Sequence, residues 1–79
     1  MKKAAYREIT DLLKAHEPFV GSSVKALYNM HGFYEVYSYQ TCILSFDPKN
    51  NKVLMFDSDF YSRTTSRLQN MLRQVFNIK

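Results

Sequence analysis

Apolar residues recur at helical spacing near the end of the chain. Five of them fit the i, i+3, i+4, i+7, i+8 pattern of an amphipathic helix: Leu68, Met71, Leu72, Val75 and Phe76. Polar residues occupy the other side of this predicted helix: Arg67, Asn70, Gln74 and Asn77. A first helix is predicted between residues 4 and 16, where apolar positions follow the same period. Pro18 ends it near Ala15 or His16, because proline disfavours helical geometry at the preceding residue.

The region between the two helices is rich in Val, Tyr, Phe and Ile, which favours strands. Four strands are predicted, at about residues 23–30, 33–39, 41–46 and 52–57. Turn residues separate the first strand from the second at His31-Gly32, and the third from the fourth over residues 47–51. No strong turn residue follows the second strand, so residues 38–41 form a bend, a bulge or part of one long strand.

This α-β-β-β-β-α order, with short connections, predicts an α+β fold in which two helices pack on one face of an antiparallel sheet. The chain of 79 residues is predicted to be a single small domain, residues 1–79. Apolar residues make up 46% and aromatic residues 15% of it, a composition that disordered chains do not have. Because the helices cover one face only, the other face of the sheet is expected to stay open.

Charge is distributed unevenly along the chain. Residues 1–59 contain seven Lys or Arg and seven Asp or Glu, whereas residues 60–79 contain four cations and no anion. The whole net charge of +4 therefore lies in the C-terminal tail. This concentration of charge predicts a surface for an anionic partner.

The start of the final helix is rich in hydroxyl groups. Ser66 has capping-box spacing to Gln69, and Ser62, Thr64 or Thr65 caps the helix instead if it begins earlier. Capping is a structural role, and it leaves the positive charges of this segment unexplained.

Arg63 and Arg67 lie at the same helix start, where the helix dipole disfavours positive charge. Two explanations remain open. Asp57 or Asp59 offsets the charges within the fold, or a phosphate group or acidic partner surface binds the guanidinium groups and the free N–H groups of the first turn. The predicted binding residues of this helix are Arg63, Thr64, Thr65, Ser66, Arg67, Asn70 and Arg73.

A second candidate surface is the aromatic part of the sheet. Five aromatic residues lie between positions 28 and 39: Tyr28, Phe33, Tyr34, Tyr37 and Tyr39. Alternation along the second strand places Tyr37 and Tyr39 on one face and Tyr34 on the other. Exposed rings suit stacking on bases or anchoring a protein interface, and the alternative is packing on one another or within a homodimer. Tyr37 and Tyr39 join the predicted binding residues.

The sequence carries no recognised catalytic or metal-binding pattern. His16, His31 and Cys42 lack metal-ligand spacing, no nucleophile motif surrounds the Ser and His residues, and the two glycines form no phosphate-binding loop. We therefore expect a protein that is not an enzyme and needs neither a metal nor a cofactor.

The cellular location follows from cysteine use and hydropathy. A lone cysteine, Cys42, permits no intramolecular disulfide, which is typical of a reducing compartment. Arg7, Glu8 and Asp11 interrupt any apolar leader, and no apolar run approaches the roughly 20 residues of a membrane-spanning helix. The expected location is the cytoplasm, without a membrane partner.

Two short motifs carry a resemblance to a known group. Residues 38–41 fit S-Y-x-T, and residues 61–69 fit Y-S-x-T-T-S-[KR]-x-Q before a short final helix. Over about residues 19–76 the chain resembles a family of small bacteriophage and prophage proteins that has no assigned activity. The resemblance implies a bacterial host and favours a protein that redirects host machinery, as inhibitors of CRISPR nucleases do.

The expected function is that of a non-catalytic, phage-type binding protein that occludes a host protein or nucleoprotein complex. That complex would serve host defence, of the CRISPR type, or nucleic-acid processing. The alternative is direct binding of DNA or RNA, with the tail arginines on phosphates and the sheet tyrosines on bases. A dimer-forming accessory protein and a binder of small anions or nucleotides are two further alternatives.

Overall fold

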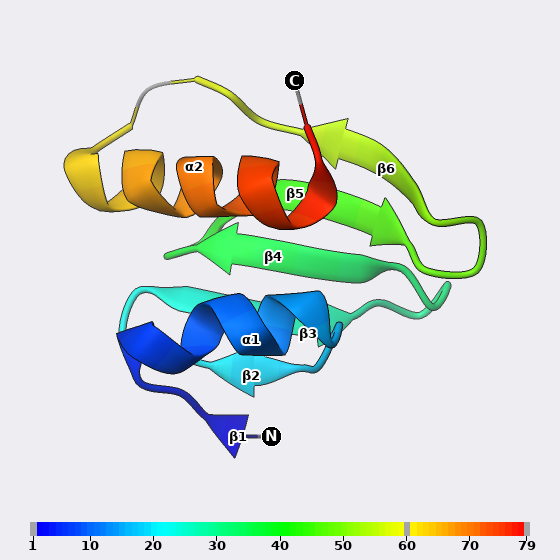
Figure 1. Ribbon diagram of the computed structural model, residues 1–79, viewed down its shortest axis with the longest axis horizontal. Helices are drawn as coiled ribbons and strands as arrows, with labels where there is room; N and C mark the ends of the chain where they lie inside the picture. The colour runs from blue at the N-terminus through cyan, green and yellow to red at the C-terminus, as the bar shows by residue number, and fades with distance from the viewer. Residues whose placement is uncertain (1, 60, 79) are drawn as a thin grey trace.

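The computed structural model of the protein describes residues 2–59 and 61–78. Figure 1 shows its elements, which in chain order are β1 (Lys2–Lys3), the 3-10 helix η1 (Tyr6–Glu8), α1 (Ile9–Lys14), β2 (Phe19–Val20), β3 (Val24–Tyr28), β4 (Tyr34–Ser38), β5 (Thr41–Asp47), β6 (Lys52–Phe56) and α2 (Arg63–Phe76).

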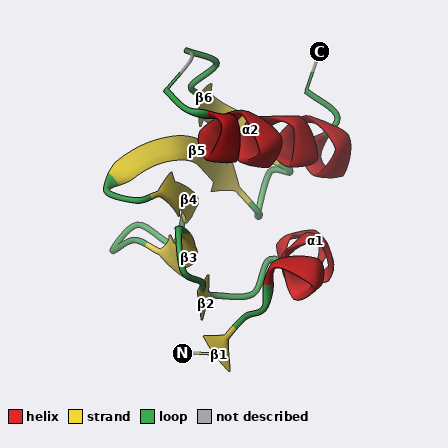
Figure 2. Cartoon of the chain, turned by 90° about the vertical axis from the view of Figure 1, so that its left-hand side faces the viewer, coloured by secondary structure: helices red, strands yellow, loops and turns green. Residues whose placement is uncertain are grey.

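The strands form one sheet in which each strand lies beside its neighbour in sequence. Over the described residues the sheet has six strands in the order β1 to β6. β1 runs parallel to β2, and every other neighbouring pair is antiparallel. Both helices lie on the same side of the sheet (Figure 2). The predicted α+β fold, with two helices on one sheet face, is confirmed. The strands β1 and β2 are not among the four predicted strands, because a strand of two residues shows no alternation of apolar and polar positions.

The hydrophobic core lies between the sheet and the two helices. Its buried residues are Ile9, Leu12, Leu13, Phe19, Val24, Ala26, Tyr34, Val36, Ile43, Leu44, Phe46, Leu68 and Leu72. In β4, burial alternates as predicted, with Tyr34 and Val36 inside and Glu35 and Tyr37 half-buried on the other face. The apolar stripe of α2 packs against this core, since Leu68 and Leu72 are buried and the other three residues of the stripe are partly buried.

Two tyrosine hydroxyls fix the segment that links α1 to β2. The hydroxyl of Tyr28 donates to the carbonyl oxygen of His16 at 2.5 Å, and that of Tyr34 donates to the carbonyl of Glu17 at 2.7 Å. His16 adopts a left-handed backbone with φ of 53°. The chain therefore turns sharply after α1, before Pro18, and enters β2 next to β3.

The connection between β4 and β5 is a tight turn of Tyr39 and Gln40. Tyr39 has a φ of 56°, which is uncommon for a residue with a large side chain. A register shift between Val36 and Tyr37 precedes the turn. Residues 38–41 therefore form a bend at Tyr39 and Gln40, one of the three geometries that the sequence leaves open, and not one continuous strand. The extra residue of the register shift is Ile43 in β5, outside this segment.

Candidate binding site at one end of the fold

A chain of hydroxyl groups anchors the start of α2 to the sheet. Ser62 is the N-cap, since its Oγ accepts the backbone N–H of Thr65 at 3.2 Å. The Ser62 hydroxyl also donates to Oγ1 of Thr65 at 3.2 Å, and that oxygen lies 2.8 Å from Oγ of Ser38 in β4. Ser38 and Thr65 are only 2% and 3% exposed. Of the predicted binding residues, Thr65 is thus placed inside the fold, where its hydroxyl holds α2 on the sheet.

Gln69 holds the segment between β6 and α2. Its Nε2 donates to the carbonyl oxygens of Asp57 at 2.7 Å and Asp59 at 2.9 Å. The side chain is buried, with 5% of its surface exposed. Gln69 therefore connects the middle of α2 to the chain that precedes it, rather than forming a capping box with Ser66.

The carboxylate of Asp57 is already engaged within this segment. It accepts the Tyr61 hydroxyl at 2.5 Å and the backbone N–H of Asp59 at 2.9 Å. The Tyr61 hydroxyl is the main cause that lowers the pKa of Asp57, and the same bond raises the pKa of Tyr61. Asp57 thus acts as an acceptor for Tyr61 and for the turn.

Arg63 and Arg67 are exposed on the first two turns of α2. Arg67 lies over the ring of Tyr6, with its Cζ atom 5.3 Å from the ring centroid. In the part of the chain that the structure describes, neither arginine forms an ion pair with Asp57 or Asp59. The internal pairing that the sequence leaves open is therefore not formed, and both arginine residues are exposed.

Three exposed tyrosines lie at the same end of the molecule as these arginines. Tyr6, Tyr39 and Tyr61 are 45%, 60% and 47% exposed. The start of α2, η1 with the start of α1, and the β4–β5 turn all lie at the left-hand end in Figure 1, the end that faces the viewer in Figure 2. We name this surface the Tyr–Arg end and define it by Tyr6, Tyr39, Tyr61, Arg63 and Arg67.

Two side-chain contacts bring these residues together from distant parts of the chain. The Ser38–Thr65 contact places the turn that carries Tyr39 beside the first turn of α2. The stacking of Arg67 on Tyr6 joins α2 to η1. The sequence gives no signal for Tyr6, which lies far from the tail, whereas Tyr61 belongs to the motif that starts the final helix.

The remaining predicted residues of α2 differ in exposure and in their distance from the Tyr–Arg end. Thr64 and Ser66 are half-buried, and Asn70 is exposed. Arg73 lies further along the helix, where its Cζ is 5.4 Å from the ring centroid of Phe56 and its Nη1 donates to Oδ1 of Asn70 at 3.4 Å. Arg73 therefore packs against β6, away from the Tyr–Arg end.

Tyr37 lies on the other side of the sheet. It alternates with the buried residues of β4, so it faces away from the helices. Its hydroxyl donates to Oε1 of Glu35 at 3.1 Å, and the Nζ of Lys25 lies 5.2 Å from its ring centroid. The predicted site therefore divides into two separate surfaces, with the arginines on one and Tyr37 on the other.

Hollows on the surface lie near both ends of the molecule. A hollow of about 90 Å³ beside Tyr39 is lined mainly by the segment between Val20 and Lys25. A hollow of about 290 Å³ at the opposite end is bordered by His16, Phe46 and the end of α2. Among residues 2–59 and 61–78, no group of His, Cys, Asp or Glu is arranged to hold a metal ion.

The chain matches no protein-family model, and no curated protein and no solved structure shows significant similarity to it. None of the helices in its described part has the length and apolar character needed to cross a membrane. The candidate site is therefore defined by the geometry of the Tyr–Arg end.

Proposed function

We propose that this protein is a non-catalytic binding protein whose Tyr–Arg end contacts an acidic surface of a macromolecular partner and occludes it. One observation carries the proposal. Arg63 and Arg67 are exposed beside three exposed tyrosines, while the nearby carboxylate of Asp57 is bound to Tyr61.

The residue types of the Tyr–Arg end suit protein recognition. Arg and Tyr are enriched among the residues that contribute most to binding energy in protein interfaces. A guanidinium group binds a carboxylate through two parallel hydrogen bonds, and a tyrosine ring supplies apolar area together with a polar hydroxyl. Glu8, close to this end, uses its Oε1 to accept the N–H of Ala5 at 3.1 Å.

Rigidity also supports a role in binding. The cap at Ser62, the buried hydroxyl contact of Thr65 and the two bonds of Gln69 fix the first turns of α2. A surface that is already ordered loses less conformational entropy when it binds. The arginines are thus presented from a fixed helix rather than from a loop.

The partner that we propose is a protein or nucleoprotein complex in the cytoplasm of a bacterial host. The resemblance to phage proteins favours a host defence complex, of the CRISPR type, or a nucleic-acid-processing complex. Two features favour a protein surface over direct nucleic-acid binding. Tyr37 lies beside the carboxylate of Glu35 on the far face, and a net charge of +4 is modest for binding phosphates.

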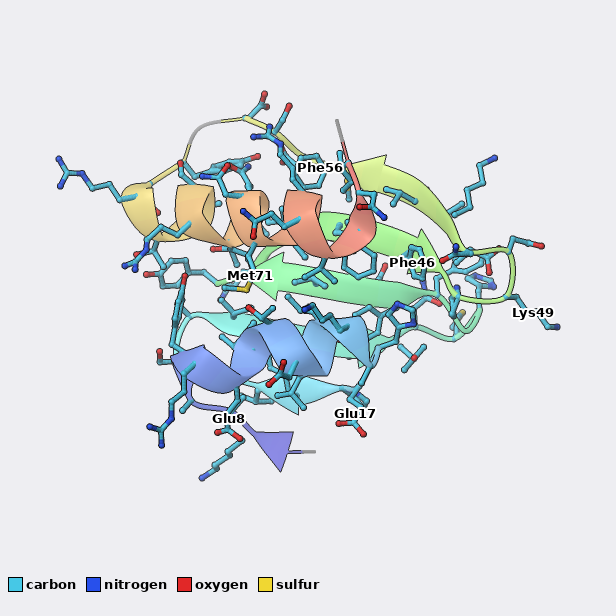
Figure 3. The ribbon with its side chains drawn as sticks, viewed as in Figure 1. Glu8, Glu17, Phe46, Lys49, Phe56 and Met71 are labelled. Carbon is cyan, nitrogen blue, oxygen red and sulfur yellow. The ribbon has the colours of Figure 1, made fainter. Side chains whose placement is uncertain are left out.

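Affinity capture from bacterial lysate, with and without nuclease, tests this proposal. The wild-type protein is compared with a variant carrying Arg63→Gln and Arg67→Gln. The matched control carries Lys14→Gln and Lys49→Gln, which removes the same charge where both residues are exposed. Lys49 lies at the end opposite to the start of α2 (Figure 3).

We expect the wild type and the lysine control to retain the same partner after nuclease treatment, and the arginine variant to lose it. Retention by the arginine variant would contradict the proposal. Loss of all captured material on nuclease treatment would favour nucleic acid instead. A steep decrease of affinity for a DNA or RNA oligonucleotide with rising salt would then confirm that alternative.

A further inference from the structure

The two edges of the sheet differ in their readiness to pair with another strand. β1 at one edge is two residues long, and both are lysines. β6 at the other edge is five residues long, and its sequence K-V-L-M-F contains one charge. Short strands and lysines prevent edge pairing, whereas a longer apolar edge permits it. Leu54 and Met55 of β6 are 43% and 40% exposed.

A bulge gives β6 an unusual pattern of side chains. Ser45 of β5 pairs with Met55, and the next residue, Phe46, pairs with Val53, so Leu54 is the extra residue. Leu54 and Met55 are both exposed, whereas Val53 and Phe56 are half-buried and pack against the core. In a regular strand, neighbours such as Leu54 and Met55 would face opposite sides.

This pattern is symmetric about the midpoint between Leu54 and Met55. In an antiparallel pair of identical strands centred there, Leu54 of one copy lies opposite Met55 of the other. Val53 then lies opposite Phe56, so inward residues meet inward residues. Centring the pair on Leu54 instead would place the exposed Lys52 opposite the half-buried Phe56.

The positions of charged residues also favour the register that is centred between Leu54 and Met55. It places Lys52 of one copy opposite Asp57 of the other, and opposite charges stabilise such cross-strand pairs. The backbone N–H of Asp57 donates to the carbonyl of Ile43 at 2.7 Å, so the ladder extends beyond Phe56 to this residue. The chain therefore carries complementary charges at the two ends of its open edge.

We propose that two copies of this protein associate through β6, antiparallel and centred between Leu54 and Met55, to form one continuous sheet. This homodimer interface is centred on Leu54 and Met55 of β6, whereas Arg63 and Arg67 lie on α2. The proposal does not depend on the proposed function.

Light scattering over a concentration series tests the association. We expect the wild-type mass to rise from 9.3 kDa toward twice that value. Leu54→Lys should lose the dimeric mass, because a lysine on the edge opposes pairing. The matched control Val20→Lys places the same charge on β2, where Val20 is 41% exposed, and should keep it. A monomeric wild type at the highest concentration, or equal loss in both variants, would overturn the proposal.

Disulfide trapping tests the register, with Cys42→Ser as the background. Leu54→Cys and Met55→Cys proteins are oxidised separately and as an equimolar mixture. We expect the mixture to form more linked dimer than either protein alone, because residues directly opposite are within reach of a disulfide. Faster linkage of Leu54→Cys alone would show that the strands are centred on Leu54, and would overturn the proposed register.

Discussion

The hydroxyl groups of Ser38 and Thr65 lie 2.8 Å apart in a buried contact between β4 and the first turn of α2. This contact fixes the helix that carries Arg63 and Arg67 against the strand that leads to Tyr39. The position of the Tyr–Arg end therefore depends on a polar pair inside the core. Breaking that pair should affect the site without touching any residue on its surface.

Thr65→Val should lower the free energy of unfolding by about 1 to 3 kcal/mol, because it leaves the buried Ser38 hydroxyl without a partner. Urea unfolding measures this change. Adding Ser38→Ala should recover part of the loss, since both polar groups are then removed. Strictly additive effects of the two changes would show that the hydroxyl contact contributes no coupling energy.

Gln69→Leu should also lower the free energy of unfolding by about 1 to 3 kcal/mol, because two backbone carbonyls lose their donor. Hydrogen exchange of the segment between β6 and α2 should become faster at the same time. Gln74→Leu, at an exposed position of the same helix, is the control and should change stability little. Equal effects of the two substitutions would contradict the role assigned to Gln69.

Tyr61→Phe should raise the pKa of Asp57 toward its ordinary value of 3.8, because the main hydrogen bond that lowers it is removed. Carboxyl NMR titration measures this shift. Asp47, whose pKa is lowered mainly by Asn50, should not respond and serves as the internal control.

The same bond makes stability depend on pH in a defined direction. A lowered pKa in the folded state stabilises the fold above the ordinary pKa of Asp57, and this contribution is lost as pH falls through the lowered value. The stability difference between wild type and Tyr61→Phe should therefore be largest above about pH 4 and shrink in more acidic solution. A difference that grows on acidification would contradict the assignment.

The double change Arg63→Gln and Arg67→Gln should alter the free energy of unfolding by less than about 1 kcal/mol, because both side chains are exposed. Thermal and urea unfolding measure this value. A large destabilisation would show that the stacking of Arg67 on Tyr6 is a structural contact, and the affinity capture would then need Arg63→Gln alone.

The periodic parts of the sequence predict the fold well. The spacing of Leu68 and Leu72 identifies α2, and the alternation around Val36 identifies β4 and its buried face. Turn chemistry correctly separates β3 from β4 and β5 from β6. These features are local, so neighbouring residues are sufficient to specify them.

The site is less predictable because it depends on contacts between distant residues. Arg67 meets Tyr6, and Thr65 meets Ser38, only after the helices pack on the sheet. The sequence likewise groups Tyr37 with Tyr39, although the turn at Tyr39 brings it to the Tyr–Arg end while Tyr37 stays on the opposite face. The sequence leaves open whether Arg63 pairs with an aspartate of the fold or stays available to a partner. This depends on the position of Asp57, which only the folded structure shows.

The unequal edges of the sheet also limit how far this chain can assemble. A molecule with two open edges can add a neighbour on each side and grow into a fibre. In the described part of the chain, β1 at the other edge is a two-residue strand of lysines that opposes pairing, so pairing through β6 uses the open edge of both copies. Raising the protein concentration should therefore lead to a closed pair rather than to filaments or gels.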